Sequence, residues 1–495
     1  MTKKLWILIP VLALMVGTAA AQDARSVLQS AATAIGANNL KSVQYSGTGW
    51  NAQFGQSYSP ESDWPRFDVP SYTRTIDYDS RSSKVEFVRV TGPTPPRGGV
   101  PFQGEQRLNQ MVSGNYAWTM EGNNANPQPA AAEVRQLDIW LTPHGFLKAA
   151  LASDNARVVA RTQGGRNLRI VSFTALGKYR VNGTITDENL VELVQTWVGN
   201  PVLGDMLYET RYTNYKDFGG VKFPTVLHSH QGDVRLNPGH NFQEVRVTNV
   251  QANVSGAALT VPDNVRQATV QPIRVTPQKL ADGVWYLLSG NQSSLLVEFR
   301  DFSAVVEAPN NDERSLAAIE EVKKLVPNKP IRYLVNTHHH FDHAGGLRTF
   351  VAEGATIVTH ERNREFYERV FFSPAPRTLQ PDRLSLYPAT PTFETVRQKY
   401  VISDGVRTMD VYFLPGLAHN ENMLIAYLPK EKIVMQGDLY GPPAPNAPPG
   451  TPNASAKAFH EFVQRMKLDI ATIAPVHGGR TAPWSEFTQF MSRAQ

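Results

Sequence analysis

The 495-residue sequence predicts a chain of two regions, a mostly antiparallel β-rich region at 22–270 and an α/β region at 275–495. From 41 to about 265, short segments alternate polar and apolar residues between Gly, Asn and Asp, a pattern typical of antiparallel strands. From 275 onwards, apolar runs alternate with segments of helical apolar spacing, which indicates strands alternating with helices. Unpatterned, proline-containing sequence at 266–277 separates the two regions. The predicted fold class is therefore α+β overall, with a second region of the α/β kind.

The amino terminus, residues 1–21, has the pattern of a secretory signal peptide. Lys3 and Lys4 precede an almost wholly apolar run at 5–16, and an Ala-x-Ala cleavage pattern ends at Ala21. The apolar run is shorter than the roughly 20 residues that a membrane-spanning helix needs. We therefore expect cleavage after Ala21, no membrane span in the mature protein, and a periplasmic or secreted location in a bacterium. A retained amino-terminal anchor is the alternative.

Composition narrows the class of protein further. The chain has no cysteine, which excludes disulfides and an acyl anchor on cysteine. The formal charge of +5 falls to +3 when the two lysines of the signal peptide are removed, and no cluster of Lys and Arg is present, so we expect no nucleic-acid partner. With 41% hydrophobic and 19% charged residues, the chain can bury a substantial core.

The β-rich region should begin with a helix at 22–40, which Gly36 can end, and should hold a second helix at 140–151 that covers one face of the sheet. The clearest predicted strands are 42–47, 84–90, 157–161, 168–173, 207–212 and 244–248.

The function of the β-rich region is open between two interpretations. The region loosely resembles the half-open sheets of periplasmic lipoprotein-carrier proteins, which implies a surface for apolar ligands or envelope partners. The other interpretation is a structural or dimer-forming domain, and the sequence leaves a homo-oligomer open. His228, His230 and His240 have no carboxylate at a fixed spacing, so we interpret them as strand or loop histidines and not as a metal site.

The segment Asn336-Thr-His-His-His-Phe-Asp-His-Ala-Gly-Gly346 carries the chemistry of the α/β region. It follows a β-branched run at 331–335 that reads as a buried strand, and the glycine pair at its end should open a helix. Side chains alternate along an extended loop, so His338 and His340 should point to one side and His339 to the other. Asp342 and His343 follow at the turn, where an oxygen and a nitrogen can face a second ion, and both ligand types suit zinc.

The pattern His-x-His-x-Asp-His resembles the signature of the metallo-β-lactamase superfamily. Three later residues match the superfamily's remaining ligands in the expected order, and each follows a short apolar run: His419, Asp438 and His477. The resemblance covers about 275–495 and implies an αββα sandwich. The strands expected at 284–288, 294–299 and 303–307 and the helix at 313–325 fit that arrangement.

The resemblance also implies a site for two zinc ions. The ligands implied for the first ion are His338, His340 and His419, and those for the second are Asp342, His343 and His477. Asp438 would bridge the two ions. Manganese or iron can also fit this mixed set of ligands. A metal-bridging hydroxide would then attack the substrate, and Asp342 would orient it and carry a proton to the leaving group. His339 and His360 have no counterpart in the family pattern and are expected to be structural.

The expected substrate is a small ester, lactone, thioester or amide. Metallo-β-lactamases proper typically have a cysteine or serine where this chain has Asp438, which ranks β-lactam hydrolysis second, and the run His419-Asn-Glu-Asn422 departs from the commoner His-Thr-x-Gly pattern and leaves the subfamily open. Proline-bearing segments at 374–391 and 440–450 should border a pocket for a small molecule. Tyr440 can either bind a substrate oxygen or pack under its loop. A non-catalytic binding protein with a vestigial metal site is the alternative of another class.

Overall fold

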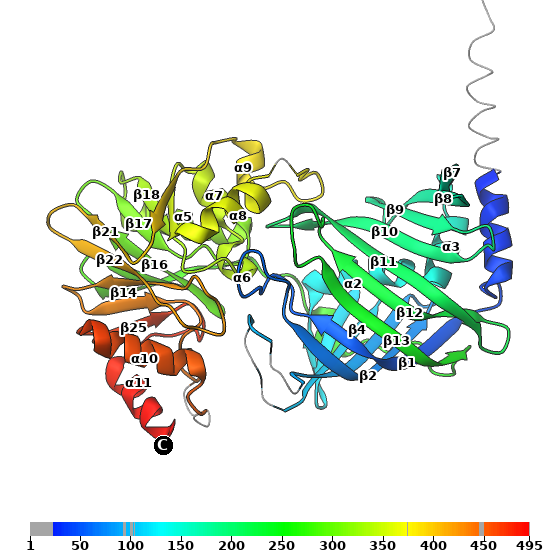
Figure 1. Ribbon diagram of the computed structural model, residues 1–495, viewed down its shortest axis with the longest axis horizontal. Helices are drawn as coiled ribbons and strands as arrows, with labels where there is room; N and C mark the ends of the chain where they lie inside the picture. Colours follow the sequence, from blue (N-terminus) through cyan, green and yellow to red (C-terminus); the bar gives the residue numbers. More distant parts are fainter. Residues whose placement is uncertain are drawn as a thin grey trace, which may run out of the picture.

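A computed structural model describes residues 23–92, 96–99, 102, 104–373, 375–444 and 450–494. The signal peptide expected at 1–21 lies outside the described residues. The described chain forms one large sheet from the amino-terminal half and two smaller sheets from the carboxy-terminal half. We call these parts the amino-terminal domain and the carboxy-terminal domain; Figure 1 shows them side by side.

The amino-terminal domain is built on a 13-stranded sheet in the order β6-β5-β4-β3-β2-β1-β13-β12-β11-β10-β9-β8-β7. Every neighbouring pair is antiparallel, as the alternating sequence pattern predicts. Its strands are β1 (Ser42–Ala52), β2 (Arg66–Asp77), β3 (Ser82–Val90), β4 (Gln106–Ser113), β5 (Tyr116–Glu121), β6 (Asn124–Pro127), β7 (Arg157–Gln163), β8 (Arg166–Ala175), β9 (Tyr179–Ile185), β10 (Val191–Asn200), β11 (Gly204–Asp217), β12 (Lys222–Gln231) and β13 (Asn241–Ala252).

Helices α2 (Ala132–Trp140) and α3 (Pro143–Leu151) connect the two edge strands β6 and β7, so this connection has to cross the face of the sheet. Their buried side chains share one core with residues of the strands, which confirms the prediction that a helix covers the sheet. The single helix predicted at 140–151 is in fact the second of two. It begins at Pro143 because the hydroxyl of Thr142 accepts a hydrogen bond from the backbone of Gly145.

The helix predicted at 22–40 spans 23–34. Gly36 follows it at φ +74°, in the left-handed region that favours glycine, and a Cβ atom there would overlap the backbone carbonyl of Gly220. A short helix, α4 (Asp263–Gln267), follows the large sheet, and an irregular segment then leads to the carboxy-terminal domain.

The carboxy-terminal domain contains a 7-stranded and a 6-stranded sheet. The first comprises β14 (Thr276–Ala281), β15 (Val284–Ser289), β16 (Gln292–Glu298), β17 (Ser303–Val306), β18 (Ile331–Val335), β19 (Thr356–His360) and β20 (Phe393–Val396). The second comprises β21 (Lys399–Ser403), β22 (Thr408–Phe413), β23 (Leu424–Leu428), β24 (Ile433–Gln436), β25 (Thr472–Pro475) and β26 (Ala482–Pro483). Apolar side chains from both sheets form one shared core, so the two sheets face each other.

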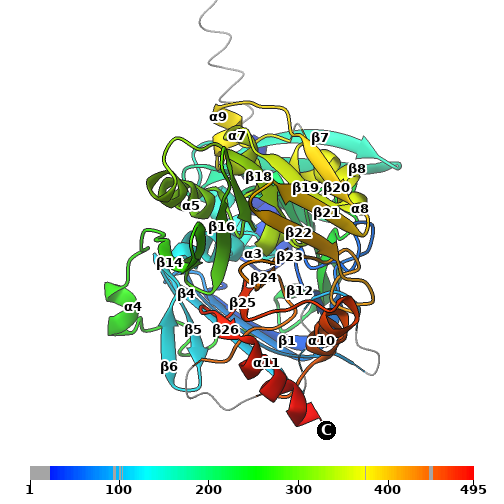
Figure 2. The same ribbon diagram turned by 90° about the vertical axis from the view of Figure 1, so that its left-hand side faces the viewer.

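Helices pack on the outer faces of these sheets. Residues of α5 (Asp312–Leu325) and α7 (Leu347–Ala352) join a core with β18 and β19, while α10 (Ala454–Met466) and α11 (Trp484–Met491) pack on β22 to β25. Figure 1 shows the two helix groups on opposite sides, and Figure 2 shows the same domain from its far end. Among the described residues of this domain, the other helices are α6 (Phe341–Ala344), α8 (Glu361–Phe366), η2 (Tyr367–Phe371), α9 (Arg383–Leu386) and η3 (Ser492–Ala494). Of the helices described, none is long and apolar enough to cross a membrane.

The segment 375–391 fastens the two domains together. The guanidinium of Arg377 donates hydrogen bonds to the backbone carbonyls of Asn200, Pro201 and Val202 at 3.2, 2.9 and 2.7 Å. Asp205 accepts hydrogen bonds from the backbone amides that follow Arg377, at 378 and 379. The expectation that 374–391 borders the substrate pocket stays a prediction. The described part of the segment docks on the amino-terminal domain through backbone carbonyls that no sequence pattern marks, and it is absent from the lining of the cavity beside the candidate metal ligands.

We predict that Arg377→Met destabilises the protein by about 3 kcal/mol, because the buried carbonyl of Val202 and the partly buried carbonyls of Asn200 and Pro201 lose their donors. A buried carbonyl left without a donor costs about 1–3 kcal/mol. Methionine keeps much of the apolar stem, so the change tests the hydrogen bonds. Urea denaturation followed by tryptophan fluorescence measures the effect, with the exposed Arg369→Met as the control. Equal denaturation midpoints for the two variants would contradict this role.

Candidate metal centre

The polar residues of the site follow strands that are almost wholly apolar and buried. Strands β17, β23 and β24 are buried at every position, so their polar side chains are confined to the ends. His338 and His340 follow β18, Asp438 follows β24 and His477 follows β25. Because these strand ends lie at one edge of the paired sheets, residues far apart in the sequence meet there.

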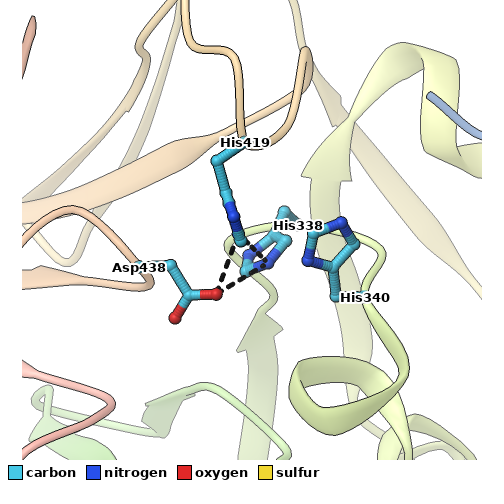
Figure 3. Close-up of side chains that lie close together, drawn as sticks. All are labelled: His338, His340, His419 and Asp438. Carbon is cyan, nitrogen blue, oxygen red and sulfur yellow. Dashed lines mark hydrogen bonds and ion pairs between the residues drawn. The ribbon is translucent and has the colours of Figure 1, made fainter. Parts of the chain in front are cut away.

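His338, His340, His419 and Asp438 form the first cluster, drawn in Figure 3, with one ligand atom of each within 4.8 Å of the others. Asp438 Oδ2 lies 2.8 Å from Nε2 of His419 and 3.6 Å from Nε2 of His338. These two Nε2 atoms are 3.4 Å apart. All three imidazoles are buried, at most 3% exposed, and they converge on the carboxylate.

Asp342, His343 and His477 form a second cluster beside the first. The Nε2 atoms of His343 and His477 are 3.1 Å apart, and Asp342 Oδ2 lies 3.5 Å from each. Asp438 Oδ1 lies 3.1 Å from both of these nitrogens. One carboxylate therefore faces both clusters, through Oδ2 on one side and Oδ1 on the other.

The secondary structure at Asp342 and His343 differs from the prediction. They lie on α6, a one-turn helix, where the sequence pattern predicted a turn before the helix. The glycine pair then separates two helices, because Gly345 ends α6 and Gly346 begins α7. Both side chains still reach the same cluster, where Asp342 Oδ2 lies 3.5 Å from Nε2 of His343.

The donor set fits divalent cations. Nδ1 of His340 and Oδ1 of Asp438 are buried, and within the described part of the chain neither has a hydrogen-bond partner. Oδ1 lacks a partner although two imidazole nitrogens are 3.1 Å away, so these atoms are close without the geometry of a hydrogen bond. Buried lone pairs that converge in this way suit a metal ion, and mixed imidazole and carboxylate ligands suit zinc.

The electrostatics differ between the two clusters. Burial lowers the pKa values of His338 and His340 well below the usual range, so both imidazoles are neutral, as metal ligands must be. Burial opposes charge at His343 and His477 too, but carboxylates outweigh it there. The carboxylates of Asp438 and Asp342 raise the pKa of His343 and, from 3.1 and 3.5 Å away, also raise the pKa of His477, to about 9. The second cluster therefore lies in a negative field that attracts cations.

Glu307 is a site residue that sequence analysis missed. It is fully buried at the end of β17, with φ at +75°, and Oε2 lies 2.9 Å from Nδ1 of His343. Its Oε1 accepts a hydrogen bond from the backbone N–H of Thr337 at 2.5 Å. Glu307 thereby orients the loop that carries the histidines and leaves Nε2 of His343 facing the second cluster. The one available indication in the sequence was a glutamate directly after the apolar run of β17.

The predictions for the remaining histidines can be compared with the structure. His339 points away from the clusters, as predicted, and lies 3.1 Å from both Ser57 Oγ and Asn420 Nδ2. His360 caps α8. His228 and His230 lie on β12, as predicted, but the structure also brings Glu209 to 2.9 Å from His230.

Glu209, His230 and His240 each offer a ligand atom within 4.8 Å of the others, so their proximity alone would allow a metal site that the sequence analysis did not expect. The rings of His230 and His240 are stacked, with centroids 4.4 Å apart and an interplanar angle of 4°. Lone pairs of parallel rings run side by side and do not converge on one point. Stacking and the hydrogen bond to Glu209 therefore explain why these side chains lie together.

A cavity of about 410 Å³ opens beside the second cluster. Its lining combines Asp342, Asp438 and His477 with Tyr440 and with Gln56 from the amino-terminal domain. The hydroxyl of Tyr440 donates a hydrogen bond to Glu486 at 3.3 Å, and its ring packs against the aromatic side chains of α11. Tyr440 therefore packs under its loop and lines the cavity at the same time.

Residues 289–477 match the sequence model of the family described as the Metallo-beta-lactamase superfamily. The carboxy-terminal domain therefore belongs to the metallo-β-lactamase superfamily, as its motifs predicted. Members of this superfamily are generally metal-dependent hydrolases.

Solved structures with detectable similarity include three metallo-β-lactamases. The protein from Pontibacter korlensis is 19% identical, with coverage of 45% of this chain and 99% of that chain and a TM-score of 0.35. The protein from Hirschia baltica is 22% identical (45% and 97% covered, TM-score 0.33), and FIM-1 from Pseudomonas aeruginosa, in its mono-zinc form, is 21% identical (46% and 97% covered, TM-score 0.32). At these identities and TM-scores the similarity carries no conclusion about activity.

We predict that Glu307→Gln weakens zinc binding at the second cluster by about 10- to 100-fold, the usual effect of losing a partner that orients a ligand. A carboxamide has one acceptor oxygen, so it cannot accept from both Thr337 and His343, and its NH₂ group must face one of the two donors. Competition with a chromophoric chelator measures the affinity. Glu313→Gln, an exposed change on α5, is the control. Wild-type affinity in Glu307→Gln would contradict the assignment.

Proposed function

We propose that this protein is an exported hydrolase with two zinc ions that acts on a small ester, lactone, thioester or amide. The position of Asp438 is the observation that carries the proposal, because its two carboxylate oxygens face two separate clusters of ligands. Manganese or iron fits the same set of ligands. The proposed export depends on the signal peptide expected at 1–21, and the proposal includes the αββα arrangement of the superfamily for 275–495.

Each cluster would hold one ion. His338, His340 and His419 would bind the first ion and leave a position free, as catalytic zinc requires. Asp342, His343 and His477 would bind the second, and Asp438 would bridge the pair. When bound, two such cations supply an acidified water molecule at neutral pH and polarise the substrate oxygen. The side chains then have to hold the substrate and move protons.

Asp342 is the residue placed for proton transfer. Its Oδ2 faces His343 and His477, and its side chain is 33% exposed at the wall of the cavity. A carboxylate there can take up a proton and deliver it to a leaving group in the cavity. No serine or cysteine nucleophile is needed in this proposal.

The cavity favours a small substrate. Its volume of about 410 Å³ is near the lower end of the range for small-molecule sites. Tyr440 and Phe490 give it aromatic walls, while Asn291 and Asn453 add polar groups. Metallo-β-lactamases proper typically have cysteine or serine where this chain has Asp438. We therefore rank esters, lactones, thioesters and other amides above β-lactams as substrates.

We predict that two variants differ in how much of the bound metal they lose. Asp342→Ala should abolish turnover and remove only part of the bound metal, because the three histidines of the first cluster remain. His340→Ala should lose activity and also the metal of the first cluster. Elemental analysis of the purified variants measures the metal content, and greater metal loss in Asp342→Ala than in His340→Ala would contradict the assignment.

The substrate class is tested with a panel of activated esters, lactones, thioesters and nitrocefin on zinc-loaded protein. We expect turnover of acyl substrates, and its loss after treatment with a chelator. Cleavage of nitrocefin without lactone or ester activity would move β-lactam hydrolysis to first place. Protein that holds two zinc ions yet hydrolyses no compound of the panel would favour a binding function.

A further inference from the structure

Two loops of the amino-terminal domain contact the metal ligands directly. The first, loop 53–58, follows β1, and its Ser57 carbonyl accepts a hydrogen bond from Nε2 of His340 at 2.8 Å. The second, loop 97–99, places the Gly99 carbonyl 2.7 Å from Nδ1 of His419. A carbonyl oxygen can only accept, so each of these imidazole nitrogens carries the proton.

These two hydrogen bonds decide which nitrogen of each histidine can bind metal. With the proton on Nε2, a neutral His340 has its lone pair on Nδ1, the buried atom that has no partner among the described residues. With the proton on Nδ1, a neutral His419 has its lone pair on Nε2, which faces Asp438 Oδ2 at 2.8 Å. Backbone carbonyls commonly fix metal-binding histidines in this way. Here both carbonyls belong to the amino-terminal domain, whereas the two histidines belong to the carboxy-terminal domain.

Gln56 acts on the second cluster. Its Nε2 donates a hydrogen bond to Oδ1 of Asp342 at 2.6 Å, and its side chain lines the cavity. Because Oδ1 is engaged by Gln56, the other oxygen of Asp342 is turned toward His343 and His477. The glutamine therefore restricts the rotation of the carboxylate that the proposed function uses for proton transfer.

Backbone contacts hold both loops against the carboxy-terminal domain. The carbonyl of Gly55 accepts from the backbone N–H of Phe341 at 3.2 Å, and the carbonyl of Tyr58 accepts from that of Glu421 at 3.0 Å. The backbone N–H of Gly98 donates to the carbonyl of Ala418 at 2.9 Å. Gly55 has φ +71°, and a Cβ atom there would lie 2.5 Å from the ring of Phe341, so only glycine allows this close approach.

We propose that the amino-terminal domain forms part of the metal centre. Gln56 is a positioning residue for Asp342, and the carbonyls of Ser57 and Gly99 hold His340 and His419 in the tautomers that bind metal. This inference rests on the proposed metal site and extends it. It makes loops 53–58 and 97–99 necessary for metal binding, because without them the ligands would not be held in the required orientation.

The test uses the full chain with Gln56→Met, which keeps the length of the side chain and removes the donor. We expect this variant to bind the first zinc ion as the wild type does and the second about 10- to 100-fold more weakly, measured by competition with a chromophoric chelator. With an acyl substrate that the wild type hydrolyses, kcat should fall by a similar factor while KM changes little, because Gln56 acts through Asp342.

Gln136→Met is the matched control. Gln136 is a buried glutamine of the same domain, 5% exposed against 8% for Gln56, and its Nε2 donates a hydrogen bond of the same 2.6 Å length to the carbonyl of Arg81. It lies on α2, away from the metal ligands, so its removal tests the general cost of losing such a bond. We expect both zinc affinities and kcat to stay at the wild-type values in this variant.

A second variant, Gly55→Ala, tests the carbonyl contacts and serves if Gln56→Met does not fold. The added methyl group should displace loop 53–58 from Phe341 and move the Ser57 carbonyl away from His340. The affinity for the first zinc ion should then fall as well. The visible spectrum of cobalt-substituted protein should then change in band position or intensity. Wild-type affinity for both ions in Gln56→Met and Gly55→Ala would overturn the inference.

The affinity measurements separate this inference from the proposed function. If the wild type binds two zinc ions but hydrolyses no compound of the panel, the proposed hydrolase activity fails, while the difference in affinity between Gln56→Met and Gln136→Met still decides the inference. If the wild type is active and Gln56→Met matches it in second-ion affinity and kcat, the inference alone fails.

Discussion

The burial of many polar side chains around one point is the constraint on which this structure depends. His338, His340 and His343 are fully buried, and Asp438 lies among them. Burying such groups costs free energy unless hydrogen bonds or an opposite charge compensate for lost hydration. Hydrogen bonds satisfy the outer nitrogens of these rings, but they leave converging lone pairs at the centre. Cations at that point would remove the remaining cost, which would couple metal binding to the stability of the fold.

The two sheets of the carboxy-terminal domain provide a rigid frame for this centre. Their shared apolar core fixes the strands, and the ligands follow the strand ends on short loops or on the one-turn helix α6. A carboxylate that has to face two clusters at once tolerates little displacement, and a close-packed core allows little. Glu307 extends this rigidity to the histidine loop, because it accepts hydrogen bonds from both ends of it.

The centre is nevertheless shared between domains. Ser57 and His340 are 283 residues apart in the sequence, and Gly99 and His419 are 320 apart, yet each pair is joined by a short hydrogen bond. Arg377 fastens the same two domains at a second place. The relative position of the domains therefore affects the orientation of the ligands, and a change at their interface can reach the metal centre without touching a ligand.

The sequence alone determined the elements with a local pattern. Alternation predicted the antiparallel sheet, helical spacing predicted the helix at 313–325, and the motif from 336 to 346 with three later residues selected the side chains that the structure brings together. These predictions succeed because burial imposes a period on neighbouring residues, and because metal ligands are restricted to a few residue types.

Only the tertiary structure decided the rest. The short helix α6, the docking of the segment after 374 on the amino-terminal domain, and the contacts of Glu307 and Gln56 depend on residues distant in the sequence, which leave no local period. The carbonyls of Ser57 and Gly99 are the clearest case. Every residue has a backbone carbonyl, so the type of a residue does not indicate whether its carbonyl will contact a histidine. The packing of one domain against the other selects the carbonyl that does.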